Sequence, residues 1–448
     1  MQYRLYNFVC WVLFIVAAPL YLMYGLLTGK YLDDMKERFG FFSFLEETAF
    51  SPNRLWFHAA SVGEVQVAKS IITETIKLIP NASFFLSTVT EQGKFLAKEQ
   101  LGKNVLCAYA PVDLPWVVKR FIRTLQPTAY VCLETELWPN MLKTAAQNGV
   151  PVLLLNGRMS ESSFKRYCYF PKFFRKVLNY FSVISCITDQ DRDRFEALGV
   201  PPETLRVNGN AKYNYKVQTS AGSRSDTEND RETDHQHILS HETEEHYRKK
   251  LAVTNRDTTF VAGSTHDGEE QQLIRVYKKI REAIPGFIML IAPRHISRIK
   301  KIESLFKKND LEYQLYSDVC VGRRDKDIIL VDTIGELAGL YSIATYIFCG
   351  GSLVPKGGHN IMEPASWGKP ILYGPNMDDF KDAQDLLESA QAGLLVKNSQ
   401  DICERILYFH KNQTEYLEAS KKALQVAVEQ HDSAKRQARI IEEILNKN

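Results

Sequence analysis

The sequence has little net charge: its 448 residues carry a formal charge of only +3 at pH 7. Nucleic-acid-binding proteins usually carry a strongly basic surface, so we expect no nucleic-acid partner. Apolar residues make up 45% of the chain and charged residues 24%, which is typical of a globular protein. The length is sufficient for two domains, each with a sizeable core.

The sequence also lacks any cluster of closely spaced cysteines. Its eight cysteines are scattered, none belongs to a C-x-x-C pair, and several, such as Cys132 and Cys186, lie within apolar runs. This spacing favours reduced, buried thiols in a cytosolic domain over a disulfide framework or a zinc site.

Charged residues are absent between Arg4 and Lys30. Residues 8–27 are almost all apolar, and about 20 such residues suffice for a helix to cross a bilayer. The stretch predicts an uncleaved transmembrane anchor over residues 1–30. A cleaved signal peptide is the alternative, because Ala17 and Ala18 are small, but the apolar run continues past them. Basic residues are more numerous after the span than before it, which favours a cytoplasmic body.

Beyond residue 30, strand-like and helix-like segments alternate in two series. The predicted strands are 54–58, 84–88, 129–133, 151–156 and 183–187 in the first series, and 259–262, 287–292, 328–331, 346–349 and 370–373 in the second. Such alternation predicts parallel sheets covered by helices on both faces. We therefore expect an α/β protein with two Rossmann-like, doubly wound domains, and ligands in a crevice at the carboxyl ends of the strands.

A polar segment, residues 218–250, separates the two series and contains almost no side chains that could form a core. We predict a mobile insertion or linker there. Its four histidines suggest a metal site, but no cysteine or ordered scaffold accompanies them, so a solvated loop is favoured and no metal site is expected. The remaining predicted parts are a first domain at 31–217, a second domain at 251–425 and a C-terminal helix at 426–448.

The most informative feature of the second series is the glycine-rich stretch at residues 350–365, GGSLVPKGGHNIMEPA, which follows an apolar strand. Its four glycines allow tight turns and let a ligand approach the backbone. Asn360 is a candidate N-cap, and a helix beginning there would point free N–H groups at an anion. Glu363, one turn later, could accept hydrogen bonds from a ribose. The alternative is a simple strand–loop–helix connector, but the carboxylate after the glycines favours a nucleotide phosphate and sugar site.

Three motifs in the first series follow predicted strands, at the carboxyl ends where catalytic residues are expected. Glu64 falls in the first turn of a helix after strand 54–58, although a carboxylate there is more often only a helix cap. Glu134 directly follows strand 129–133 and lies close to Trp138 and Pro139. Lys212 lies at the end of the first domain and is either a solvated surface lysine or directed towards the crevice.

Residues 164–180, FKRYCYFPKFFRKVLNY, alternate bulky aromatic and basic side chains. Aromatic rings favour the membrane interface, and basic side chains are attracted to anionic lipid. The segment therefore predicts a membrane-binding surface. The alternative is an amphipathic helix that packs on the core and leaves a solvated basic face.

Six motifs together resemble the Kdo (3-deoxy-D-manno-octulosonic acid) transferases of lipopolysaccharide assembly, in the order found in that family. They are HAASVGEV (58–65), ETELWPN (134–140), NGNAKYN (208–214), APRH (292–295), DTIGEL (332–337) and GGHNIMEPA (357–365). The resemblance runs from the N-terminal stretch to the C-terminal helices, and residues 218–250 are the main departure from it.

The resemblance implies a GT-B glycosyltransferase whose first domain binds the acceptor and whose second binds the nucleotide sugar, facing each other across a cleft. It implies transfer of Kdo from CMP-Kdo to a lipid A precursor, lipid IVA, at the cytoplasmic face of the inner membrane, with inversion and without a metal or other cofactor. Whether one Kdo residue or several are added in succession stays open.

By this resemblance Glu64 is the catalytic base, and Glu134 and Lys212 stabilise the transition state. The implied CMP contacts are Pro293, Arg294, Ile334, Gly335, Glu336, Asn360, Ile361, Met362 and Glu363. Two alternatives remain: another GT-B enzyme of envelope synthesis that uses a UDP-sugar and a lipid acceptor, and a catalytically inactive nucleotide-sugar-binding protein.

Overall fold

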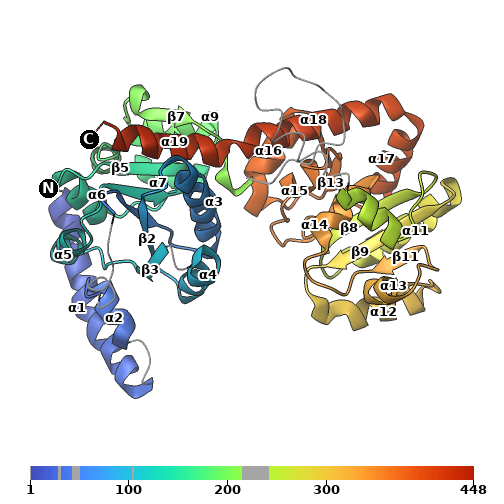
Figure 1. Ribbon diagram of the computed structural model, residues 1–448, viewed down its shortest axis with the longest axis horizontal. Helices are drawn as coiled ribbons and strands as arrows, with labels where there is room; N and C mark the ends of the chain where they lie inside the picture. Colours follow the sequence, from blue (N-terminus) through green and yellow to red (C-terminus); the bar gives the residue numbers. More distant parts are fainter. Residues whose placement is uncertain (1, 29–31, 43–50, 103–104, 214–241, 448) are drawn as a thin grey trace. The chain divides into compact units, whose positions relative to one another are not determined.

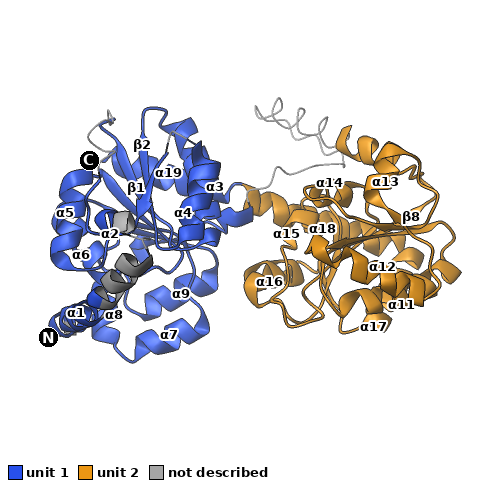
Figure 2. Ribbon diagram, turned by 90° about the horizontal axis from the view of Figure 1, so that it is seen from below, with its two compact units in different colours: residues 1–214, 432–448 blue, residues 215–431 orange. Residues whose placement is uncertain are grey.

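The computed structural model describes residues 2–28, 32–42, 51–102, 105–213 and 242–447. The chain forms two compact units (Figures 1 and 2): unit 1 contains residues 1–214 and 432–448, and unit 2 contains residues 215–431. Each unit is built on a seven-stranded parallel sheet. The predicted α/β class with two parallel sheets is confirmed.

The sheet of unit 1 has the strand order β3-β2-β1-β4-β5-β6-β7. Its strands are β1 (Arg54–His58), β2 (Ser83–Thr88), β3 (Val105–Tyr109), β4 (Ala129–Leu133), β5 (Val152–Gly157), β6 (Val183–Cys186) and β7 (Leu205–Val207). Strand order reverses between β1 and β4, which pair in parallel. In open α/β sheets, ligands bind at the carboxyl edge at such a switch point.

Helices cover both faces of this sheet, because alternate residues of each strand point to opposite sides. Leu55 and Val131 belong to one core, with α3 (Val62–Leu78) and α19 (Ser433–Leu445) packed on it. Trp56 and Tyr130 belong to the opposite core. The helices that contribute to the second core are α5 (Pro115–Leu125), α6 (Pro139–Gln147), α8 (Pro171–Leu178) and α9 (Asp189–Ala197). The other long helix between strands, α4 (Glu91–Leu101), lies beside α3.

The basic and aromatic segment at 164–180 forms α7 (Glu161–Cys168) and α8. Phe164, Tyr167 and Phe173 pack against the core. Tyr169 and Phe170, between the two helices, are exposed. The segment is therefore mainly a pair of amphipathic helices, and its tip alone presents aromatic rings to the surroundings.

The N-terminal stretch forms α1 (Gln2–Thr28), followed by α2 (Leu32–Arg38). The predicted transmembrane anchor is not found: among the described residues, no helix is both long enough and apolar enough to cross a membrane. Instead, the first turns of α1 are bound to unit 1. The Tyr3 hydroxyl donates to the carbonyl of Pro139 (2.6 Å), and the Tyr6 hydroxyl donates to Oδ2 of Asp113 (2.7 Å).

Unit 2 repeats the arrangement, with the strand order β10-β11-β9-β8-β12-β13-β14 and a switch point between β8 and β12. Its strands are β8 (Thr258–Thr265), β9 (Phe287–Pro293), β10 (Gln314–Leu315), β11 (Ile328–Leu330), β12 (Tyr346–Cys349), β13 (Ile371–Tyr373) and β14 (Gly393–Leu395). Its helices include α11 (Glu269–Ala283), α12 (Ile299–Lys308), α13 (Tyr316–Val321), α14 (Leu337–Leu340), α15 (Met362–Ala365), α16 (Lys381–Ser389), α17 (Ser399–Lys411) and α18 (Gln413–His431).

Two boundaries differ from the predicted ones. The C-terminal part expected at 426–448 is divided, because α18 belongs to unit 2 and α19 to unit 1 (Figure 2). Gln437 of α19 is buried in unit 1, where it accepts from the amide of Asn156 and donates to the carbonyl of Gly209. Most of the expected insertion, 218–241, lies outside the described residues. Residues 242–250 are helical.

Candidate active site

The carboxyl edge of β1 and β4 in unit 1 brings together the three predicted catalytic residues. Glu64 lies in the first turn of α3, directly after β1, and Glu134 directly follows β4. Lys212 lies in a short 3-10 helix, Ala211–Tyr213, between two buried residues that fix its backbone. A Cβ atom on Gly63 would lie 3.9 Å from Nζ of Lys212, so the lysine reaches the turn that carries Glu64.

Glu64 is buried, with 5% of its surface exposed. Its Oε2 accepts from the amide of Ala60 (2.8 Å), and its Oε1 accepts from the hydroxyl of Ser61 (2.8 Å). Ser61 is also the N-cap of α3. Burial raises the pKa of Glu64 to about 8, and the negative charges of Glu134 and Glu136 act in the same direction. A carboxyl group with such a pKa can exchange protons near neutral pH.

Glu134 and Lys212 form an ion pair, with 2.6 Å between Oε1 and Nζ. Their side chains are 22% and 29% exposed, so both can be reached by a ligand. Glu134 also has a positive φ of 53°, a left-handed conformation that is costly for a residue with a side chain. Backbone strain of this kind is concentrated at functional sites.

The site contains two further residues that lie in the predicted motifs but had no role assigned to them: Glu136, the second acid after β4, and His58. Glu136 accepts from the indole of Trp138 (2.8 Å), and burial raises its pKa. His58, at the end of β1, is completely buried and bonds through Nδ1 to the hydroxyl of Ser87 (3.0 Å). Burial lowers the pKa of His58 to about 4, so the ring is neutral at pH 7. Both residues lie inside recognised motifs, which was the available signal.

In unit 2 the glycine-rich loop after β12 is occupied by a carboxylate of the protein itself. Glu269, completely buried at the start of α11, accepts from the amides of Gly351 (2.8 Å), Ser352 (3.1 Å) and Leu353 (3.0 Å). These amides are therefore not available to a phosphate. Sequence reasoning missed Glu269 because it precedes the loop by about 80 residues and only the fold brings them together.

Two histidines lie beside the same loop. Nε2 of His266 and Nε2 of His359 are 2.9 Å apart, and the rings are stacked. Gly351 leaves room for them, because a Cβ atom there would lie 3.1 Å from the ring of His359. Burial lowers the pKa of His359 to about 4, and the charge of the nearby Arg294 contributes. Arg294 follows β9 and has an exposed side chain, as a phosphate-binding arginine requires.

The predicted contacts at 334–336 form a second cluster. Ile334 is 87% exposed, and Gly335 has a φ of +93°. Glu336 accepts from the hydroxyls of Tyr316 (2.7 Å) and Tyr247 (2.8 Å). Burial works to raise the pKa of Glu336, but these hydroxyls and the charge of Lys250 outweigh it, so the pKa lies below its ordinary value.

The helix predicted to begin at Asn360 begins at Met362, and its N-cap is Ile361. The side chain of Asn360 accepts from the amide of Met362 (3.0 Å), so it caps the helix from one residue earlier. Ile361 and Met362 are buried, which leaves their backbone rather than their side chains for a ligand. Glu363 is partly buried, and burial raises its pKa.

A family model described as 3-deoxy-D-manno-octulosonic-acid transferase matches residues 33–215. A transferase of that name from Haemophilus influenzae is 29% identical over 88% of this chain and 88% of that protein. Another, from Chlamydophila psittaci, is 31% identical over 85% of this chain and 82% of that protein. The chain belongs to the Kdo transferase family. It is therefore a glycosyltransferase, as the six motifs predict.

The fold of this Kdo transferase family member also occurs in a solved structure of an enzyme with a different activity. The UDP-GlcNAc 2-epimerase of Neisseria meningitidis matches with a TM-score of 0.57 and 13% identity, over 88% of this chain and all of that one. At that identity the match shows a common fold only. Within the described residues of this transferase, no group of three or more His, Cys, Asp or Glu side chains is arranged to hold a metal ion.

Proposed function

We propose that the enzyme transfers Kdo from CMP-Kdo to a lipid A precursor with inversion at the anomeric carbon and without a metal ion, as a GT-B glycosyltransferase. The observation that carries this proposal is the switch point of unit 1. There a buried carboxyl group with a pKa of about 8, Glu64, lies beside the ion pair of Glu134 and Lys212.

Inversion requires one base that takes the proton of the acceptor hydroxyl as the oxygen attacks the anomeric carbon. Glu64 supplies that base, since its raised pKa makes it a stronger proton acceptor than an ordinary carboxylate once it is ionised. Proton transfer of this kind typically contributes about 10²–10⁴-fold to the rate. Glu134 orients the ammonium group of Lys212, which stabilises negative charge in the transition state.

The leaving group is CMP, which gains negative charge on its phosphate as the bond breaks. Arg294 meets that charge, because its guanidinium is exposed at the carboxyl end of β9 and can bind a phosphate through two hydrogen bonds. Glu336 and Glu363 are the acceptors for the ribose hydroxyls. The backbone of Pro293, Gly335 and the stretch from Asn360 to Met362 forms the rest of the donor site.

We place the enzyme at the cytoplasmic face of the inner membrane, where an acylated acceptor resides. Support comes from exposed apolar side chains on α1, among them Leu5, Phe8 and Val16, and from Tyr169 and Phe170 at the tip between α7 and α8. Lys165, close to that tip, is exposed as well, and basic groups are attracted to anionic lipid.

Mass spectrometry of lipid products, after incubation of the purified enzyme with CMP-Kdo and lipid IVA, tests the proposal and counts the Kdo residues added. We expect products heavier by one or more Kdo residues, formed equally well in the presence of EDTA. Turnover with a UDP-sugar instead of CMP-Kdo would show a different envelope glycosyltransferase. Binding of CMP-Kdo without any product would show an inactive binding protein, and loss of turnover in EDTA would refute the metal-independent mechanism.

A further inference from the structure

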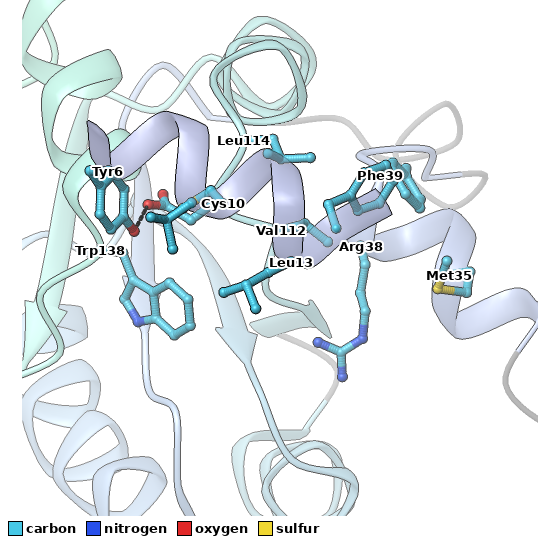
Figure 3. Close-up of a pocket in the computed structure, with 12 residues that line it drawn as sticks. Tyr6, Cys10, Leu13, Met35, Arg38, Phe39, Val112, Leu114 and Trp138 are labelled. Atoms are coloured by element: carbon cyan, nitrogen blue, oxygen red, sulfur yellow. Dashed lines mark hydrogen bonds between the residues drawn. The ribbon is translucent and has the colours of Figure 1, made fainter. Parts of the chain in front are cut away.

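A large apolar groove lies in unit 1 between α1, α2 and the loop before α5 (Figure 3). Its volume is about 580 Å³, within the range of small-molecule sites. Most of its lining is hydrophobic: α1 contributes Val9 and Leu13, α2 and the turn after it contribute Met35 and Phe39, and the loop contributes Leu114.

The wall of the groove beside Tyr6 is held by a buried polar contact, so that the groove is formed without a ligand. Asp113 accepts from the hydroxyl of Tyr6 and from the amides of Asn140 and Met141, at 2.7, 3.0 and 2.8 Å. These donors satisfy its carboxylate and fix α1 against the loop. Burial raises the pKa of Asp113.

The same end of the groove reaches the candidate active site. Trp138 lines the groove, and its indole N–H donates to Oε2 of Glu136, in the motif that contains Glu134. The ring of Trp138 also lies edge-on to His58 at the end of β1, with 6.2 Å between centroids. A chain in the groove would therefore end beside the residues proposed for catalysis.

Basic side chains flank the groove. Arg38 lines one end, where its guanidinium also lies 4.4 Å from the centroid of the Tyr109 ring. At the other end, the ammonium groups of Lys143 and Lys176 lie 4.8 and 5.7 Å from the centroid of the Tyr3 ring, which itself contacts Tyr6. An apolar groove with cationic side chains at both ends is complementary to an amphiphile whose acyl chain is attached to an anionic head group.

We propose that this groove binds one acyl chain of the acceptor lipid and thereby positions its sugar hydroxyl at Glu64, an inference that rests on the proposed function. A chain that moves from a bilayer into the groove leaves one apolar environment for another. The groove therefore contributes orientation and discrimination between acylated and deacylated acceptors more than overall affinity.

Cys10 provides a direct probe, because its side chain lines the groove and is partly exposed, whereas Cys168 on α7 is exposed and does not line the groove. The full chain is labelled with N-ethylmaleimide in the presence of phosphatidylethanolamine–phosphatidylglycerol vesicles, and modification of each cysteine is followed by mass spectrometry. We expect tetraacylated lipid IVA in the vesicles to slow the labelling of Cys10 at least fivefold and to leave Cys168 unchanged.

Three results would overturn the proposal: no protection of Cys10, equal protection by the deacylated disaccharide bisphosphate, or complete protection by the vesicles alone. The last result would mean that the groove simply faces the bilayer. None of these readouts needs Kdo transfer. If the wild-type enzyme transfers Kdo to no acceptor but lipid IVA still protects Cys10, the proposed function is wrong and the assignment of the groove as an acyl-chain site stands.

A pair of variants on α1 tests discrimination. Leu13→Trp narrows the groove, and Val12→Trp adds the same indole to an exposed neighbour that does not line it. We expect Leu13→Trp to lower the kcat/KM for lipid IVA relative to that for the deacylated disaccharide about tenfold, while Val12→Trp leaves the ratio unchanged. An unaltered ratio in a folded Leu13→Trp enzyme, checked by circular dichroism, would refute the assignment.

Discussion

The ionisation of Glu64 should control the rate of transfer. With a pKa of about 8, this carboxyl group is about one tenth ionised at pH 7 and about nine tenths ionised at pH 9. If the ionised form accepts the proton of the acceptor hydroxyl, kcat/KM should rise about tenfold over this interval. The assay is the initial rate of CMP release from CMP-Kdo at acceptor concentrations well below KM, measured at half-unit steps of pH.

Replacement of Glu64 by glutamine removes the base and keeps the shape. We expect Glu64→Gln to lower kcat by about 100-fold or more, to abolish the rise with pH and to leave CMP binding unchanged. Ser61→Ala is the matched control, because it removes the N-cap and one hydrogen bond to Glu64 but retains the carboxylate. It should cost about 1 kcal/mol of stability and keep the rise of the rate with pH, moved to higher pH because the lost hydrogen bond lowers the pKa of Glu64 in the wild type.

The same variant makes a prediction about stability. The folded-state pKa of Glu64 lies above its ordinary value of 4.5, so the folded protein holds this proton more tightly than the unfolded chain does. That contribution to stability is present below pH 4.5 and is progressively lost as the pH rises to about 8. The difference in Tm between Glu64→Gln and the wild type should therefore change in favour of the variant as the pH rises from 5 to 8. Near-normal turnover together with no such gain would show that Glu64 is only a helix cap.

Two further variants test the rest of the site. Lys212→Met should reduce kcat at least about 100-fold while unfolding in urea changes by no more than about 1 kcal/mol, because partly exposed ion pairs contribute little to stability. Lys77→Met, which breaks the pair with Glu74 on the same unit, should leave kcat unchanged, and equal losses in both variants would contradict a catalytic role for Lys212. Arg294→Ala should weaken CMP binding in calorimetric titration by about 1.5–3 kcal/mol, whereas the exposed neighbour Lys300→Ala should not; unchanged affinity in Arg294→Ala would remove it from the donor site.

The sequence predicts the parts of the site that depend on local pattern. Alternating strands and helices imply parallel sheets, and residues that directly follow strands, such as Glu134 and Arg294, then lie at the carboxyl edge. Contacts between distant segments could not be predicted in this way. Glu269 reaches amides about 80 residues away, and Tyr6 reaches an aspartate about 100 residues away.

The N-terminal stretch shows why composition alone was insufficient there. Its apolar residues are typical of a membrane span, but Tyr3 and Tyr6, just before them, find polar partners in unit 1. A hydropathy profile assigns each residue type one value and carries no information about the acceptor that a particular tyrosine hydroxyl meets in the fold. Similarly, the glycines at 351 and 358 suggested a ligand, whereas Gly351 is required for the close packing of two histidine rings.

The return of α19 to unit 1 affects the order in which the protein can fold during synthesis. Ala434, Ile440 and Ile441 complete a core that begins with Leu55, so unit 1 stays unfinished until α19 has left the ribosome. Unit 2 is in effect inserted into unit 1, and it can fold first. A nascent chain or fragment that ends near residue 214 exposes the apolar face of α3 and should depend on chaperones. A chain truncated just before Ser433 lacks α19, so it should fail to fold unit 1 although only a short C-terminal segment is removed.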